Sequence, residues 1–167
     1  MFSLLLAFAA HADDATRARV VDLLSAYDTP PKAEDWRAVG PEAGAELFAI
    51  AQDTSFSHTR RAAAVFALGY FPTDTHKAWL TTLATTEGGD ALLRRKAVHA
   101  LANGWGEAAL PTLATALGSA DTQLRAAAAR ATARVGTPAA VTLLRDRLAQ
   151  ESDGMVHDVI ARALEAK

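Results

Sequence analysis

The chain contains no cysteine, which excludes disulfide bonds, thiol catalysis and cysteine metal sites. Aromatic residues make up 7% of its 167 residues, and β-branched or aromatic runs with a period of two do not occur. The sequence therefore predicts no β-strand. It also has no basic excess, since the formal net charge is -2, so a nucleic-acid partner is not expected.

Alanine, by contrast, is abundant, and half of the residues are hydrophobic. Alanine has the highest helix propensity but buries little area, so the composition predicts helices that approach one another closely. The charge is unevenly distributed. Residues 13–53 hold four basic and nine acidic residues, a net of -5, and the rest of the chain has a net of +3.

The first residues form an apolar run from Phe2 to Ala10, followed by Ala10-His11-Ala12 and two aspartates. This pattern is typical of a secretory signal peptide, although the run is short and no basic residue precedes it. We expect residues 1–12 to be a signal peptide cleaved after Ala12 and the protein to be periplasmic or secreted. If the run is instead a structural helix, the protein is cytoplasmic. The run is too short to span a bilayer, which needs about 20 residues.

A repeat of 31 to 33 residues is the strongest signal in the chain. Its register begins with a basic residue, followed three positions later by a small or apolar residue and seven later by another. These offsets lie on one face of a helix. The basic register holds Arg61, Arg94, Arg125 and His157; the third position holds Ala64, Ala97, Ala128 and Ile160; the seventh holds Leu68, Leu101, Thr132 and Leu164.

Each of these helices has a capping residue four positions before the basic register position. Asp90, Asp121 and Asp153 occupy it in three copies and Ser57 in the first. Such side chains accept hydrogen bonds from the free N–H groups at a helix start, at about 1 kcal/mol each. The spacing of four also predicts ion pairs between each Asp and the following Arg, with His157 pairing with Asp153 in the last copy.

A second helix precedes each of these, with starts marked by Gly40-Pro41, Pro72-Thr73, Gly106-Glu107 and Thr137-Pro138. The sequence therefore predicts helix pairs at residues 41–69, 73–103, 106–135 and 137–165. An N-terminal helix and linker are expected at 13–40, ahead of a repeat array at 41–167.

The pattern of an apolar residue before Arg, Ala three positions after it and an apolar residue near the seventh resembles the HEAT-repeat signature. Leu124-Arg125 with Ala128, Val135 and Gly136 carries it well. The first and last copies depart from it, as terminal repeats do. Asp35 to Pro41 also resembles the linker ahead of the array in bacterial extracytoplasmic HEAT-repeat proteins. The resemblance implies a right-handed α-solenoid of about four helix pairs, whose second helices line a concave face, and a scaffold function.

Some HEAT-like proteins are enzymes, but the sequence offers no clear catalytic motif. Deoxyhypusine hydroxylases carry His-Glu pairs, and no histidine here precedes glutamate. A lyase-type chaperone and a nucleic-acid base enzyme remain as alternatives. His157-Asp158 is interpreted as structural, because adjacent helical residues point about 100° apart. We expect no catalytic residue, no metal site and no cofactor.

Projecting the second helices onto the concave face predicts a binding stripe that is aromatic at its first end and basic at its last. Arginine there suits carboxylates, and aromatic rings offer apolar area. The expected partner is an acidic, partly apolar peptide or protein segment; an acidic N-terminal helix folding back onto the groove is an alternative. The stripe consists of Phe66, Tyr70, Arg95, His99, Asn103, Arg130, Arg134 and Arg162.

Overall fold

The computed structural model describes residues 14–26 and 31–166. The expected signal peptide, residues 1–12, lies outside this part of the chain. Every regular element that the described residues form is a helix, so the all-α prediction is confirmed. The elements before the array are an N-terminal helix, which covers residues 14–24, and α2 (Ala33–Val39).

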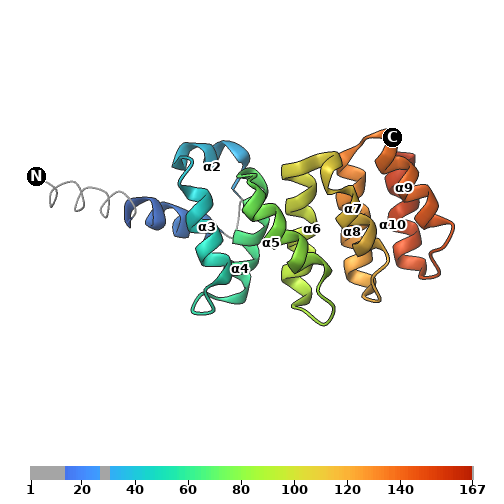
Figure 1. Cartoon of the computed structure of the whole chain (residues 1–167), viewed down its shortest axis with the longest axis horizontal. Helices are drawn as coiled ribbons and strands as arrows, with labels where there is room; N and C mark the ends of the chain where they lie inside the picture. Colours follow the sequence, from blue (N-terminus) through green and yellow to red (C-terminus); the bar gives the residue numbers. More distant parts are fainter. Residues whose placement is uncertain (1–13, 27–30, 167) are drawn as a thin grey trace, which may run out of the picture.

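Four helix pairs follow along the long axis of the molecule (Figure 1). Each pair is antiparallel, and the α-solenoid expected from the repeat is confirmed. The pairs are α3 (Ala43–Gln52) with α4 (His58–Ala67) and the 3₁₀ turn η1 (Leu68–Tyr70); α5 (Asp74–Thr85) with α6 (Ala91–Trp105); η2 (Gly106–Ala109) and α7 (Leu110–Leu117) with α8 (Thr122–Val135); and α9 (Pro138–Leu148) with α10 (Gly154–Glu165).

The second helices of the pairs form the more closely packed layer. Helices α4, α6, α8 and α10 pack directly against one another in succession, whereas neighbouring first helices contact one another much less. An array that is tight in one layer and spread in the other bends toward the tight layer. The second helices therefore line the concave side.

Small residues at the repeat positions permit this close packing. Ala64, Ala97 and Ala128 are fully buried, as are Leu68 and Leu101. Leu164, at the free end of the array, is half-buried. A Cβ on Gly69 would lie 2.7 Å from the carbonyl oxygen of Ala100, so glycine is required where η1 meets α6.

The helix starts follow the predicted capping residues. Asp90 accepts hydrogen bonds from the N–H groups of Leu92 and Leu93, and Asp121 caps α8 in the same way. Asp153 and Ser57 cap α10 and α4 through one bond each. One start differs from the prediction: residues 106–109 form a 3₁₀ turn, and the α-helix begins at Leu110, followed directly by Pro111 in its first turn.

The N-terminal helix docks on the first pair. Its Val20 and Leu24 are buried, Arg17 donates to Glu46 at 3.0 Å, and Ser25 accepts from Arg60 at 2.9 Å. The helix therefore covers the end of the array (Figure 1) and does not fold onto the basic part of the stripe near α8, which was the alternative expectation. Among the described residues, no helix is long and apolar enough to cross a membrane.

Candidate functional site on the concave face

The aromatic end of the predicted stripe lies on α4 and η1. Phe66 and Tyr70 are half-buried, and their rings meet edge to face with centroids 6.1 Å apart. The Nζ of Lys96, from α6, lies 5.7 Å from the centroid of Phe66. A cation over an aromatic face is attracted by the quadrupole of the ring. This end of the stripe is thus a joint aromatic and cationic surface.

Lys96 was not among the residues that the sequence predicted for the stripe. The signal was available, because Lys96 precedes His99 by three positions and Asn103 by seven, and so shares a helical face with both. The projection of the second helices onto the concave face did not include this position.

The middle of the stripe is a cluster of three cations around one histidine. We call Lys96, Arg130 and Arg134 the basic cluster; they come from α6 and α8, and their positive charges act on His99 of α6. None of the three forms an ion pair with a carboxylate in the part of the chain that the structure describes. Arg130 and Arg134 are exposed. The cluster therefore presents unneutralised positive charge to solvent.

The pKa of His99 is lowered by its burial and by this charge. Its burial disfavours the protonated ring, and the positive charges of Arg134, Lys96 and Arg130 disfavour it further, which together lower the pKa of His99 to about 4. The ring is consequently neutral at neutral pH. Its Nδ1 is buried and has no hydrogen-bond partner within the described chain. Among residues 14–26 and 31–166, no acidic or hydroxyl side chain is hydrogen-bonded to His99, as a general base or a nucleophile pair would require.

The remaining stripe residues are held less closely. Asn103 accepts a hydrogen bond from Nη1 of Arg134 at 3.0 Å, which fixes the Arg134 side chain between α6 and α8. Arg95 is half-buried on α6, and Arg162 is exposed on α10. Neither is joined to the basic cluster by a hydrogen bond or ion pair among the residues described. The structure thus joins the residues in the middle of the stripe, whereas Arg162, at its basic end, has no hydrogen bond or ion pair with them among the residues described.

The arginines of the repeat register connect the two helices of a pair. Arg61 donates from Nε to the carbonyl of Ala51 at 3.1 Å, and Arg94 donates to that of Ala84 at 3.3 Å. These carbonyls lie at the C-terminal ends of α3 and α5, where helices leave acceptors unsatisfied. The predicted Asp–Arg ion pairs are wrong: the capping carboxylates of α6 and α8 accept hydrogen bonds from backbone N–H groups, and the second oxygen of Asp90 lies 2.6 Å from Nε2 of His58.

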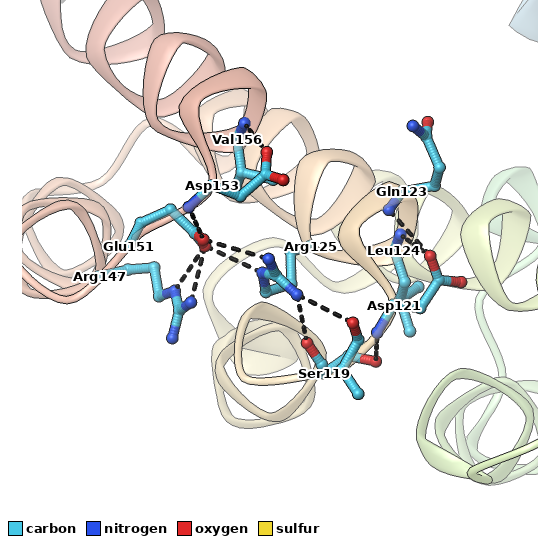
Figure 2. Close-up of polar contacts among 10 residues, drawn as sticks. Ser119, Asp121, Gln123, Leu124, Arg125, Arg147, Glu151, Asp153 and Val156 are labelled. Atoms are coloured by element: carbon cyan, nitrogen blue, oxygen red, sulfur yellow. Dashed lines mark hydrogen bonds and ion pairs between the residues drawn. The ribbon is translucent and has the colours of Figure 1, made fainter.

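Arg125 adds a second partner in the next repeat. Figure 2 shows its guanidinium between the carbonyl of Ser119, at 2.8 Å, and the carboxylate of Glu151, at 2.9 and 3.1 Å. Arg147 donates to the same carboxylate at 2.6 and 3.2 Å, and the N–H of Asp153 donates at 3.0 Å. Both carboxylate oxygens are thus fully used, and this network is structural.

Glu151 is the most strongly perturbed carboxylate of the network. Its side chain is 1% exposed. Burial by itself raises the pKa of the carboxyl, but the hydrogen bonds from Arg125, Arg147 and the N–H of Asp153 outweigh that effect and lower the pKa to about 2. The sequence analysis missed Glu151, because nothing in the local sequence shows that a loop carboxylate is enclosed by two arginines.

His157 takes a different partner from the one expected. Its nearest acidic atom is Oδ1 of Asp158, 4.0 Å from Nδ1, and no ion pair to Asp153 forms. Both side chains are at least half exposed. Across residues 14–26 and 31–166, no group of three or more His, Cys, Asp and Glu side chains is arranged to hold a metal ion.

Comparisons with known proteins support the architecture. No curated protein matches the sequence. Among solved structures, the chain is similar to a chain of the complex of CpcE and CpcF of phycocyanin lyase from Nostoc sp. PCC7120, with a TM-score of 0.60 and 18% identity over 89% of this chain and 98% of that one. A family model described as HEAT repeats matches residues 84–165. Residues 84–165 are therefore HEAT repeats, and helix pairs of the same kind continue upstream of the match.

Proposed function

We propose that this protein is a non-enzymatic interaction scaffold that binds an acidic, partly apolar segment of a partner protein on its concave face. The observation that carries this proposal is that Lys96, Arg130 and Arg134 lie on the adjoining helices α6 and α8, which Arg134 and Asn103 bridge, without a carboxylate partner in the described chain. Like charges held together raise the free energy of the unbound protein, and an anionic ligand relieves that repulsion.

The geometry of the stripe supports a peptide or protein segment as the ligand. Arg134 is positioned by Asn103 on α6, so part of the ordering cost of binding is already met before the ligand arrives. The guanidinium groups of Arg130 and Arg134 can each bind a carboxylate through two parallel hydrogen bonds. The aromatic pair on α4 and η1 adds apolar contact area at the first end of the stripe.

A second candidate is an accessory or catalytic HEAT-like protein of the lyase type. The structural likeness to a phycocyanin lyase chain supports it, at an identity that speaks for the fold alone. The two functions differ in their ligand. A lyase-type protein would bind a phycobilin and shift its absorption spectrum, whereas the scaffold leaves that spectrum unchanged and binds acidic peptides.

A charge-reversal experiment tests the scaffold function. We expect the double substitution Arg130→Glu and Arg134→Glu to weaken binding of a fluorescein-labelled Glu-rich Gly-Ser peptide by at least about tenfold at low salt. The salt dependence of the remaining affinity should also be reduced, because fewer charges meet across the interface. Fluorescence anisotropy at several salt concentrations measures both effects.

A matched control separates the effect of charge at the basic cluster from the effect of the net charge of the protein. Lys77→Glu with Arg145→Glu changes the net charge equally, but both residues lie on first helices, α5 and α9. This variant should bind the peptide within about threefold of the wild-type protein. Equal weakening by both double variants, or no weakening by the first, would reject the concave basic cluster as the binding site.

A further inference from the structure

A pocket of about 520 Å³ lies between the N-terminal helix and the first helix pair. Its walls are mostly apolar, with Leu23 and Leu24 from the N-terminal helix, Trp36 from α2, Ala63 and Phe66 from α4, and Lys96 from α6. Pockets of this size and character are typical of sites that take up apolar groups. The concave stripe predicted from the sequence did not include this pocket.

The walls of the pocket are held in place by polar contacts around it. Arg17 of the N-terminal helix donates to Glu46, and Arg19 donates to the carbonyl of Ala38 in α2 at 3.2 Å. Arg17 and Arg60 also lie on the ring of Phe56, at 5.7 and 5.8 Å from its centroid. The N-terminal helix is therefore fixed to the array by several independent contacts, so the pocket is formed before a ligand binds.

The pocket is continuous with the stripe. Phe66 lines the pocket, and its ring also meets that of Tyr70 edge to face. Lys96 lines the pocket and stands over the same ring, and it belongs to the basic cluster around His99. A chain lying along the stripe would therefore contact two residues, Phe66 and Lys96, that also line the pocket.

We propose that this pocket binds one large apolar side chain, of the size of leucine or phenylalanine, from the same acidic segment that the basic cluster binds. The inference rests on the proposed function. The recognised motif would then have two parts, an apolar anchor for the pocket and acidic residues for the basic cluster. Lys96 at the rim repels a basic residue and attracts an acidic one next to the anchor. The N-terminal helix then acts as part of the binding site as well as the cover of the array.

The spacing of the motif follows from the helix positions. Neighbouring packed helices lie about 8–10 Å apart, so the pocket beside α4 and the arginines of α8 are separated by roughly two such steps. An extended chain advances about 3.3 Å per residue. The acidic residues should therefore stand about six residues from the apolar anchor.

Two labelled peptides test the inference. Both carry the same run of Glu and the same Gly-Ser spacer, and they differ at the anchor position, which is Phe in one and Ser in the other. We expect the wild-type protein to bind the Phe peptide about tenfold more tightly than the Ser peptide, because the ring becomes buried. Fluorescence anisotropy gives both dissociation constants.

Variants that fill the pocket test whether the tighter binding of the Phe peptide arises there. Ala63→Trp fills the pocket from α4, and we expect it to remove the preference for Phe while the affinity for the Ser peptide stays unchanged. Thr59→Trp, at the exposed rim, serves the same purpose if the first variant does not fold. Ala139→Trp, on the exposed face of α9, is the control and should keep the preference.

The outcomes distinguish this inference from the proposed function. Equal binding of both peptides by the wild-type protein, or a preference for Phe that survives both blocking variants, would overturn the pocket and leave the basic cluster standing. Binding of neither peptide would overturn both.

Discussion

Glu151→Gln is expected to destabilise the protein by about 3–5 kcal/mol at neutral pH, as measured by urea unfolding. Glutamine has the shape of glutamate but no charge, and it cannot accept bonds from Arg125 and Arg147 as a carboxylate does. The two guanidinium groups, 11% and 21% exposed, would then be left without their shared counter-charge. Removing one member of a buried ion network is costly for this reason.

The same carboxylate makes stability depend on pH. Its folded pKa of about 2 is below the ordinary value of 4.5, so its contribution to stability is fully present above pH 4.5 and is lost as the pH falls toward 2. The difference corresponds to about 3 kcal/mol over that window. We expect the Glu151→Gln variant to lose this part of the acid sensitivity.

The control for this prediction is Glu87→Gln. Glu87 is exposed in the turn before α6, and its substitution should change the free energy of unfolding by less than about 0.5 kcal/mol. A Glu151→Gln variant as stable as the control would show that the network in Figure 2 contributes little to the fold.

Leu101→Ala should cost about 2–5 kcal/mol of unfolding free energy. Leu101 is fully buried at the seventh repeat position of α6, in the middle of the array. Alanine is the commonest residue of the buried core, and its short side chain cannot move into the cavity. Urea unfolding followed by circular dichroism measures the loss.

Leu164→Ala is the matched control, since it removes the same atoms at the same repeat position. Leu164 is half-buried at the free end of α10, so its loss should cost clearly less than that of Leu101. Equal costs at the two positions, or a cost near zero at Leu101, would mean that the repeat register is wrong.

The parts of the structure that the sequence predicted are the local ones. A capping Asp needs only the N–H groups two and three residues ahead, so Asp90 and Asp121 could be assigned from spacing alone. Periodicity placed Leu101 and Ala97 in the core for a similar reason: helix geometry fixes which residues share a face.

The parts that the sequence did not predict depend on contacts between repeats. Arg94 has an Asp at helical spacing, yet it binds a carbonyl at the end of the preceding helix, which becomes close only after the pair folds. Glu151 gains two arginines from different helices, and Lys96 gains a ring from α4. The pocket beside Trp36 requires the docking of the N-terminal helix, which no repeat pattern reveals.

The central claim is that the concave face carries unneutralised positive charge that binds an acidic segment. The pKa of His99, which burial lowers first and the three cations lower further, should change when that charge is changed. The measurement is the pKa of His99 from an NMR titration, with the signal assigned through a His99→Gln variant. We expect a value of about 4 in the free protein and a higher value in the Arg130→Glu and Arg134→Glu variant. At pH about 5.5, added acidic peptide should move the His99 signal toward its protonated position, because carboxylates favour the charged ring. A pKa near 6.5 in the free protein, or a His99 signal that acidic peptide does not move, would contradict the account.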